Sequence, residues 1–253
     1  MKPCYVTTSW DDGSALDMRC LELHQRYGLR GTFYICSNLP NTASNLLTPA
    51  MTRTIADAQE IGAHTVTHAR LTEIPGEAVR REVCDSKSDL EQLLGRPVDM
   101  FCYPFGAYNE AVRNVVQEAG FRGARTIKRY QFSLPDDPFQ MNTGLRAFPH
   151  PYFPKQHLRQ NWRFALRANS YDTAYLLRLG FPPVAHFSWV EMAKRMFDRV
   201  ARDGGVWHLW GHSWEVEQQG MWDQLEEVFR YIAGRGHVTY CTNGELIGGI
   251  RAT

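Results

Sequence analysis

Two pairs of ionisable residues follow apolar runs in the first third of the chain. Asp11 and Asp12 are adjacent and precede Gly13, and His64 and His68 are separated by three β-branched residues. Asp-Asp-Gly alone commonly marks a solvated turn, and two histidines are often structural. One carboxylate with two imidazoles, however, supplies three protein ligands and leaves positions open for water and substrate, as a catalytic metal site requires. The combination therefore predicts a divalent metal site.

A third group lies near the C-terminus, in the sequence WHLWGHSWE of residues 207–215. His208 falls inside an apolar run and is expected to be a hydrogen-bonded core residue. His212 follows a glycine, where a loop is expected, and a histidine in a partly apolar pocket can protonate a leaving amine. We therefore expect His212 to act as a general acid. The sequence favours neither Glu215 nor Asp198 as the residue that orients its ring.

A turn after another apolar run carries Tyr103 and Phe105 ahead of Asn109. Its proline and glycine permit a tight turn, which can present the backbone N–H of Phe105 to a developing oxyanion. The alternative is an ordinary loop in which Asn109 caps the following helix.

Short apolar segments alternate with amphipathic ones along most of the chain, which is the pattern of strands that feed helices in a parallel α/β architecture. The predicted strands cover residues 5–10, 31–36, 62–66, 100–103, 121–126, 206–210 and 238–241. The predicted helices cover residues 15–27, 52–61, 76–94, 109–119, 190–202 and 221–234. Four glycines are expected to end helices in the left-handed conformation, namely Gly28, Gly62, Gly120 and Gly204. This pattern predicts a single domain over residues 1–253, a closed α/β barrel.

Residues 129–184 interrupt the alternation with many prolines and aromatic residues. We expect an elaborated loop with a short helix, inserted into the one domain. Long loops in compact proteins often form lids or binding loops. The aromatic residues of this segment would then either stack on a sugar or simply cover the barrel.

The composition excludes several classes of protein. With 43% hydrophobic residues and a formal net charge of +1, the chain is typical of a globular protein with no long-range attraction to nucleic acid or anionic membranes, so a small or neutral substrate fits better. The six cysteines are scattered singly and are expected to be buried, reduced thiols. No signal peptide or membrane span is visible, so a cytoplasmic protein is expected if Met1 is the natural start. No heptad pattern indicates an oligomeric state.

Taken together and in order, these motifs resemble those of the polysaccharide deacetylase family, which has NodB homology and is carbohydrate esterase family 4. The resemblance runs from about residue 5 to residue 241. The family motif T-F-D-D-G is similar to TSWDDG at residues 8–13, and H-S/T-x-x-H is similar to residues 64–68. R-P-P-Y-G resembles YPFGAYN at residues 103–109, and L-x-H resembles residues 210–212. The resemblance implies a distorted (β/α)7 barrel.

The resemblance also implies a role for each matched residue. Asp11 corresponds to the catalytic base and His212 to the general acid. The metal ligands correspond to Asp12, His64 and His68, with zinc expected first and cobalt, nickel, manganese or iron as alternatives. The candidates for substrate or oxyanion binding are Tyr103, Phe105, Arg125 and Trp210.

The chain departs from the family pattern in two respects. Cys102 stands where the family often carries an arginine that steadies the base, and the family's fourth motif, with Asp and Trp, has no counterpart. Arg125, at the end of the next predicted strand, is a candidate for the missing cation. The alternative is that Arg125 is a surface residue.

The resemblance implies a metal-dependent N-deacetylase, a hydrolase of carbon–nitrogen bonds other than peptide bonds, that converts an N-acetylated sugar to acetate and a free amine. The sugar could be nucleotide-linked, lipid-linked, a simple glycoside or an oligomer. One alternative is a cyclic-amide hydrolase of the allantoinase type, which the intact set of Asp12, His64 and His68 disfavours. The other is a catalytically silent carbohydrate-binding barrel, whose usual mark is the loss of a metal ligand or of the base.

Overall fold

The computed structural model describes residues 2–39, 45–149, 173–174, 176–181 and 188–251. Within these residues the chain forms an eight-stranded sheet with the order β5-β4-β3-β2-β1-β7-β6, and β8 pairs with β1. All pairs of neighbouring strands are parallel. The strands are β1 (Cys4–Asp12), β2 (Gly31–Ile35), β3 (Glu60–Ala63), β4 (Met100–Cys102), β5 (Gly123–Arg125), β6 (Leu145–Arg146), β7 (Gly205–Gly211) and β8 (Val238–Tyr240).

The segment that contains β6 closes the sheet. Met141 forms a parallel bridge with Arg125 at the end of β5, and a few residues later Leu145 pairs with Leu209 of β7. The chain between residues 141 and 146 thus crosses from one edge of the sheet to the other. The result is a distorted (β/α)7 barrel, which confirms the predicted fold class. Leu145 and Arg146, within the segment 129–184 that was expected to be an insertion, therefore contribute a strand to the barrel. Residues 150–172, 175 and 182–184 of that segment lie outside the described residues, so the expected loop and short helix stay a prediction there.

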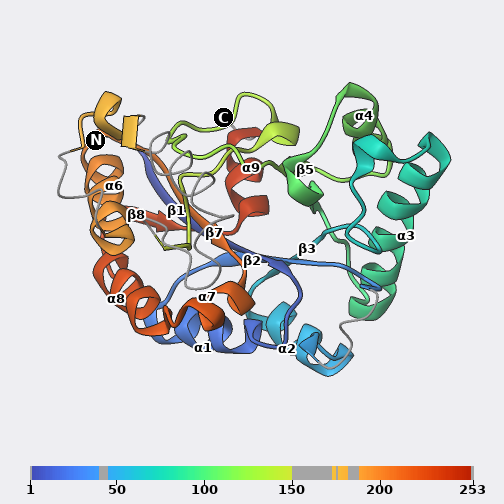
Figure 1. Ribbon diagram of the computed structural model, residues 1–253, viewed down its shortest axis with the longest axis horizontal. Coiled ribbons are helices and arrows are strands. Elements are labelled where there is room, and N and C mark those ends of the chain that lie inside the picture. The colour runs from blue at the N-terminus through green and yellow to red at the C-terminus, as the bar shows by residue number, and fades with distance from the viewer. Residues whose placement is uncertain (1, 40–44, 150–172, 175, 182–187, 252–253) are drawn as a thin grey trace, which may run out of the picture.

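Helices surround the barrel in the order α6, α8, α1, α2, α3 and α4, as Figure 1 shows. All six predicted helices are present, and α7 and α9 are two further helices that the sequence pattern did not indicate. The helices are α1 (Asp17–Tyr27), α2 (Pro49–Ala58), α3 (Gly76–Leu94), α4 (Glu110–Glu118), α6 (Trp189–Asp203), α7 (Ser213–Gln219), α8 (Trp222–Ile232) and α9 (Asn243–Arg251). Within the described residues, none has both the length and the apolar character needed to cross a membrane.

The glycines behave as predicted at Gly28 but not at Gly62. Gly28 ends α1 with a φ of 63°, in the left-handed conformation that glycine adopts without steric cost. Helix α2, in contrast, already ends at Ala58, and Gly62 lies inside β3. A Cβ at Gly62 would lie 2.4 Å from the ring of Tyr34. This glycine therefore permits close packing between neighbouring strands and is not a helix cap.

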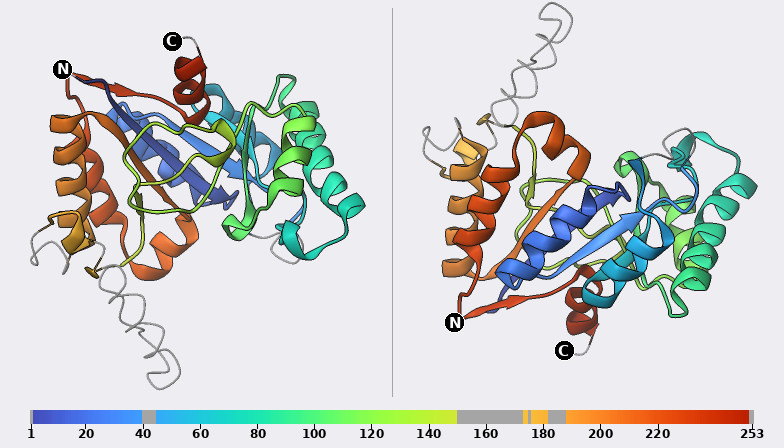
Figure 2. Two further views of the ribbon diagram at one scale, coloured as in Figure 1. Left: turned by 90° about the horizontal axis from the view of Figure 1, so that it is seen from above. Right: turned by 90° about the horizontal axis from the view of Figure 1, so that it is seen from below.

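Two apolar clusters hold these layers together. The larger one fills the space between the sheet and the surrounding helices, because the strands are buried on both faces, as expected for a parallel sheet. The smaller one includes Tyr34, Cys102, Met141 and, from α9, Ile247. Figure 2 shows α9 at the same end of the molecule as the N-terminus. The carboxyl ends of the strands, at the opposite end of the barrel, remain open for a site.

Candidate active site

The carboxyl ends of the strands carry most of the residues singled out from the sequence. They line a cavity of about 440 Å³ at this end of the barrel. Because all strands run parallel, residues that follow different strands meet at one end, which is where α/β barrels place their sites. The predicted residues that line the cavity are Asp11, Asp12, His64, His68, Tyr103, Phe105, Trp210 and His212.

Three of these side chains form a group that could hold a metal ion. Oδ1 of Asp12 lies 3.7 Å from Nε2 of His64 and 3.5 Å from Nε2 of His68. A tetrahedral ion at about 2.1 Å from each of its ligands keeps those ligands about 3.4 Å apart, so the spacing fits. Oδ1 of Asp12 is also buried without a hydrogen-bond partner in the described structure. A cation at this point would satisfy that oxygen.

The backbone is strained where it presents this group. Asp12, Thr65 and His68 have φ values of 80°, 67° and 60°, in the left-handed region that non-glycine residues rarely adopt. Each such residue costs of the order of 1–3 kcal/mol, and strain of this kind clusters at functional sites. The loop between the histidines is held by Glu82, whose carboxylate accepts the backbone N–H of Val66 at 2.9 Å.

The protonation of His64 suits a metal ligand. Its Nδ1 donates to the carbonyl oxygen of Cys102 at 2.8 Å, so Nε2 presents a lone pair toward Asp12. Burial lowers the pKa of His64 to about 4, although Asp11 and Asp12 oppose this. The ring is therefore neutral at neutral pH, as metal binding requires.

Asp11 is held by Arg125. The guanidinium donates to Oδ2 of Asp11 and, from the same nitrogen, to Sγ of Cys102 at 2.8 Å. Burial alone would raise the pKa of Asp11, but Arg125, His64 and His212 together hold it below its ordinary value. Oδ1 of Asp11 is buried and has no partner in the described structure. The site thus contains an ionised carboxylate with one free oxygen.

Asp11, His64 and Cys102 form a second group whose ligand atoms lie close enough to share an ion. Two features argue against this group. Arg125 already places a positive charge against both Asp11 and Cys102, so a cation there would be repelled. Burial also raises the pKa of the Cys102 thiol well above its ordinary value, which keeps its proton on. The group of Asp12, His64 and His68 is the better candidate.

His212 is oriented by a carboxylate that sequence reasoning left undecided. Its Nδ1 donates to Oε2 of Glu215 at 2.7 Å, and Arg146 donates to both oxygens of Glu215 at 2.6 and 2.7 Å. Nε2 of His212 lies 3.8 Å from Oδ2 of Asp12. Burial would lower the pKa of His212, but Glu215 and the two aspartates raise it above its ordinary value. The carboxylates thus favour the protonated form of the imidazole that faces the candidate metal site.

Four residues that line the cavity were missed in the sequence, namely Arg70, Ile127, Arg146 and Trp214. Arg146 belongs to β6, whose two residues show no strand pattern. Trp214 donates its indole N–H to Oδ2 of Asp12 at 3.0 Å and so fixes the second oxygen of that carboxylate. Only its place beside His212, in a tryptophan-rich stretch, could have indicated Trp214.

The residues expected to bind substrate lie in different surroundings. Phe105 is 50% exposed. Trp210 is buried, and the guanidinium carbons of Arg125 and Arg146 lie 4.8 and 5.2 Å from the centre of its ring. Tyr103 is buried, and its hydroxyl donates to the carbonyl oxygen of Phe139 at 3.2 Å. Arg125 is fully buried and does not line the cavity. It is therefore placed to hold Asp11 and not to touch a substrate.

His208 is a core residue, as expected. Its Nε2 lies 2.9 Å from the hydroxyl oxygen of Ser9, and its Nδ1 lies 3.2 Å from the carbonyl oxygen of Asn142. Burial and the nearby Arg125 lower the pKa of His208 to about 3. Both ring nitrogens are thus already engaged away from the candidate metal site.

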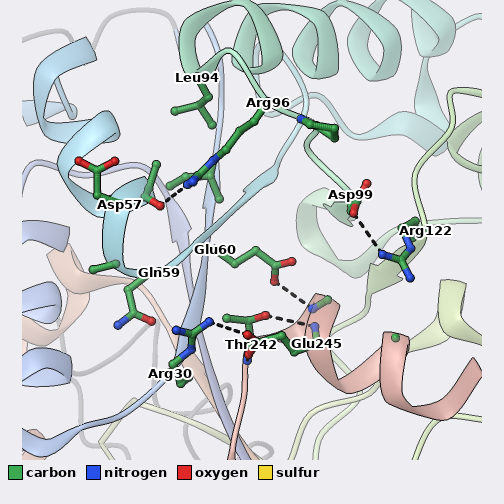
Figure 3. Close-up of a pocket in the computed structure, with 16 residues that line it drawn as sticks. Arg30, Asp57, Gln59, Glu60, Leu94, Arg96, Asp99, Arg122, Thr242 and Glu245 are labelled. Carbon is green, nitrogen blue, oxygen red and sulfur yellow. Dashed lines mark hydrogen bonds and ion pairs between the residues drawn. The ribbon is translucent and has the colours of Figure 1, made fainter. Parts of the chain in front are cut away.

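A second cavity, of about 460 Å³, lies at the N-terminal ends of the strands, and Figure 3 shows its lining. Its charged residues are largely paired with one another. Arg30 contacts Glu245 at 2.6 Å, and Arg122 contacts Asp99 at 3.4 Å. No histidine or cysteine lines it. The candidate catalytic residues named above instead line the cavity at the opposite end of the barrel.

Comparison with known proteins finds one matching family and several similar solved structures. Residues 1–124 match the family described as polysaccharide deacetylase. No curated protein matches the chain. A polysaccharide deacetylase from Bacillus cereus is 25% identical, with 54% of this chain and 45% of that protein covered and a TM-score of 0.47. This chain thus spans less than half of the length of that protein.

Two further solved structures match nearly the whole chain. A candidate polysaccharide deacetylase from Mycobacterium smegmatis is 16% identical, with 99% of this chain and 91% of that chain covered and a TM-score of 0.68. A family 4 carbohydrate esterase from Streptomyces lividans, solved in complex with acetate, is also 16% identical, with coverages of 94% and 92% and a TM-score of 0.55. At this identity the two structures show a shared fold.

Proposed function

We propose that this chain, whose first 124 residues match the polysaccharide deacetylase family, is a metal-dependent N-deacetylase acting on an N-acetylated sugar. It would hydrolyse the acetamido group and release acetate and a free amine. The observation that carries the proposal is the convergence of three groups on one cavity. These are the Asp12, His64 and His68 group, the carboxylate of Asp11 with one free oxygen, and the His212 imidazole held by Glu215.

Asp12, His64 and His68 would hold the divalent ion, and their donor set suits zinc first. When bound, such an ion polarises the acetamide carbonyl and lowers the pKa of the attacking water. The burial that keeps His64 neutral and the indole N–H that Trp214 donates to Asp12 prepare the ligands for that role.

Asp11 is the proposed general base. Its Oδ2 is engaged by Arg125, so the free Oδ1 is the atom that accepts the proton of the attacking water. Arg125 keeps this carboxylate ionised and fixes its direction. Arg125, from β5, thereby takes the place of the arginine that Cys102 replaces in the family motif.

His212 is the proposed general acid. Its Nε2 faces the cavity, while Nδ1 is bound to Glu215, so the proton on Nε2 is the one that passes to the departing nitrogen. Arg146 holds Glu215 in place through both carboxylate oxygens. The backbone N–H of Phe105 is the proposed protein donor to the oxyanion, from a turn in which Phe105 has a φ of 58°.

The experiment that tests this function measures acetate release from a panel of N-acetylated sugars by the zinc-loaded protein. The panel contains a free sugar, a nucleotide-linked sugar, a lipid-linked sugar and a chitin oligomer. We expect acetate from at least one member, and none after the metal is removed by a chelator. A protein that holds a metal ion but releases acetate from no member would contradict the proposal.

The pair of His212 and Glu215 predicts a change in pH dependence. Glu215 helps to raise the pKa of His212, so Glu215→Gln should lower that pKa. The acid form of His212 is then lost at a lower pH. We therefore expect the alkaline limb of the pH profile of kcat/KM to move to lower pH in this variant.

The matched control for this prediction is Glu217→Gln, on the same helix. Glu217 accepts the indole N–H of Trp222 at 2.5 Å and does not contact His212. Its substitution should leave the alkaline limb where it is in the wild type. An unchanged limb in Glu215→Gln as well would refute the assignment of His212 as the acid.

A further inference from the structure

An exposed aromatic ring stands at the rim of the catalytic cavity. Phe105 is 50% exposed, and it is one of only three large apolar side chains exposed in the described part of the chain. The turn that carries Phe105 is tight, because Phe105 and Gly106 both have positive φ values, of 58° and 64°. A Cβ at Gly106 would lie 2.3 Å from the side chain of Ile127, so that side chain packs tightly against the turn. Strain and exposure at one residue of a site indicate a role in binding.

Arg70 covers this ring. Its guanidinium carbon lies 4.4 Å from the centre of the Phe105 ring, and the ring of His68 contacts the same phenyl at 4.5 Å. Nε of Arg70 lies 3.4 Å from Glu73, a side chain that is 72% exposed, so this pair is weak. Neither Nη atom of Arg70 donates a hydrogen bond to a described residue. A planar cation with two free donors thus lines the cavity beside a proposed metal ligand.

The charge of Arg70 is not needed to balance the site. The carboxylates that line the cavity are Asp11, Asp12 and Glu215. Arg125 and Arg146 each pair with one of them, and the proposed divalent ion would more than neutralise the third. Arg70 therefore adds positive charge to a site that is already neutralised, which the net charge of +1 for the whole chain does not reveal. An excess of one sign in a cleft raises the local concentration of ligands of the opposite sign.

We propose that Arg70 binds an anionic group of the substrate, so that the preferred substrate is an N-acetylated sugar that carries a phosphate or a carboxylate near the reacting acetamide. This inference rests on the proposed function. A guanidinium placed over an aromatic ring offers paired N–H donors, which match the oxygens of either group. The two possible sources are a phosphate that links the sugar to a carrier and a carboxylate of an acidic sugar.

The test compares three substrates that differ in charge. They are the neutral methyl glycoside of N-acetylglucosamine, N-acetylglucosamine 1-phosphate and N-acetylmuramic acid, which carries a carboxylate. We expect wild type to have the higher kcat/KM on one of the anionic substrates, and the one preferred identifies the source. Arg70→Gln should raise KM for that substrate by about tenfold and leave KM for the neutral glycoside nearly unchanged. The preference should also weaken as ionic strength rises.

Arg19→Gln is the matched control. The guanidinium of Arg19 likewise lies 4.4 Å from the centre of an aromatic ring, that of Trp222, and has a distant carboxylate partner, Glu217, at 3.8 Å. It does not line the catalytic cavity. Its substitution should leave the preference for the anionic substrate intact.

The outcomes separate this inference from the function on which it rests. Equal kcat/KM on all three substrates, with no change in Arg70→Gln, would overturn the role of Arg70 and leave the deacetylase proposal standing. If no substrate is hydrolysed, the role of Arg70 is still tested by calorimetry, which measures the binding of N-acetylglucosamine 1-phosphate and of N-acetylmuramic acid to the zinc-loaded protein. An anion site is supported if the wild type binds one of these compounds and the affinity falls about tenfold in Arg70→Gln but not in Arg19→Gln. The anion site is refuted if the wild type binds neither compound.

Discussion

Replacing Asp11 by asparagine is expected to lower kcat/KM for acetate release by about 10³-fold, because an amide cannot accept the proton that the proposed base takes from water. The amide is nearly the same size as the carboxylate, so the ligands Asp12, His64 and His68 should still bind the ion. The measurement is the rate of acetate release from the best substrate of the panel, together with the metal content of the variant.

The same substitution has a cost in stability that must be controlled. Arg125 is fully buried against Asp11, and loss of one partner of a buried ion pair lowers the free energy of unfolding by about 3–5 kcal/mol. The ion pair stabilises the native state at pH values above the ordinary pKa of aspartate and ceases to do so as pH falls through the lowered pKa of Asp11. Assays should therefore be run well below the melting temperature of the variant.

Asp17→Asn is the matched control for this experiment. Asp17 is also buried, and burial raises its pKa well above the ordinary value, although a hydrogen bond from Ser213 at 2.6 Å opposes this. An amide at this position resembles the protonated acid, so the rate should change little. Wild-type activity in a folded, metal-loaded Asp11→Asn variant would exclude Asp11 as the base.

His68→Ala is expected to lose the metal ion and at least about 100-fold of the activity, since it removes a whole ligand and not only a supporting contact. His68 is partly exposed and lies at the surface of the cavity, so its removal should perturb the fold less than that of buried His64. Metal content by mass spectrometry is the first readout. The second is the melting temperature, which zinc should raise in wild type but not in this variant.

Cys102→Ser distinguishes the two possible metal groups. Cys102 belongs only to the group that Arg125 disfavours, whereas His68 belongs only to the preferred group. The Cys102→Ser variant should therefore keep its metal ion and its thermal shift with zinc. Retention of the ion by His68→Ala and its loss from Cys102→Ser would place the metal between Asp11, His64 and Cys102 instead.

Most of the fold could be predicted from the sequence because strands and helices follow local patterns. All seven predicted strands occur, since each is a short apolar run that ends at a polar loop. The exception among the barrel strands is β6, which is only two residues long, contains Arg146 and is defined by its pairing with β7. Helix α9 was missed because its three glycines obscure the helical pattern.

Within the proposed site, the candidate metal ligands could be predicted because they lie close together in sequence at strand ends: Asp12 is the last residue of β1, and His64 and His68 follow β3. The residues that hold the catalytic side chains in place could not be predicted. Glu215 lies only three residues from His212, but nothing in the local sequence shows that its side chain turns toward that ring. Arg125 was recognised as a possible cation, and only its full burial against Asp11 separates that role from substrate binding.

The sequence by itself determined which residue types follow each strand, and parallel strands then bring all of those residues to one end of the barrel. The tertiary structure alone decided which of them touch. Arg125 reaches Asp11 across 114 residues of chain, and Arg146 reaches Glu215 across 69. Such contacts depend on the order of the strands, their register and the closure of the barrel by β6. These properties arise from packing of the whole chain, so no local pattern in the sequence records them.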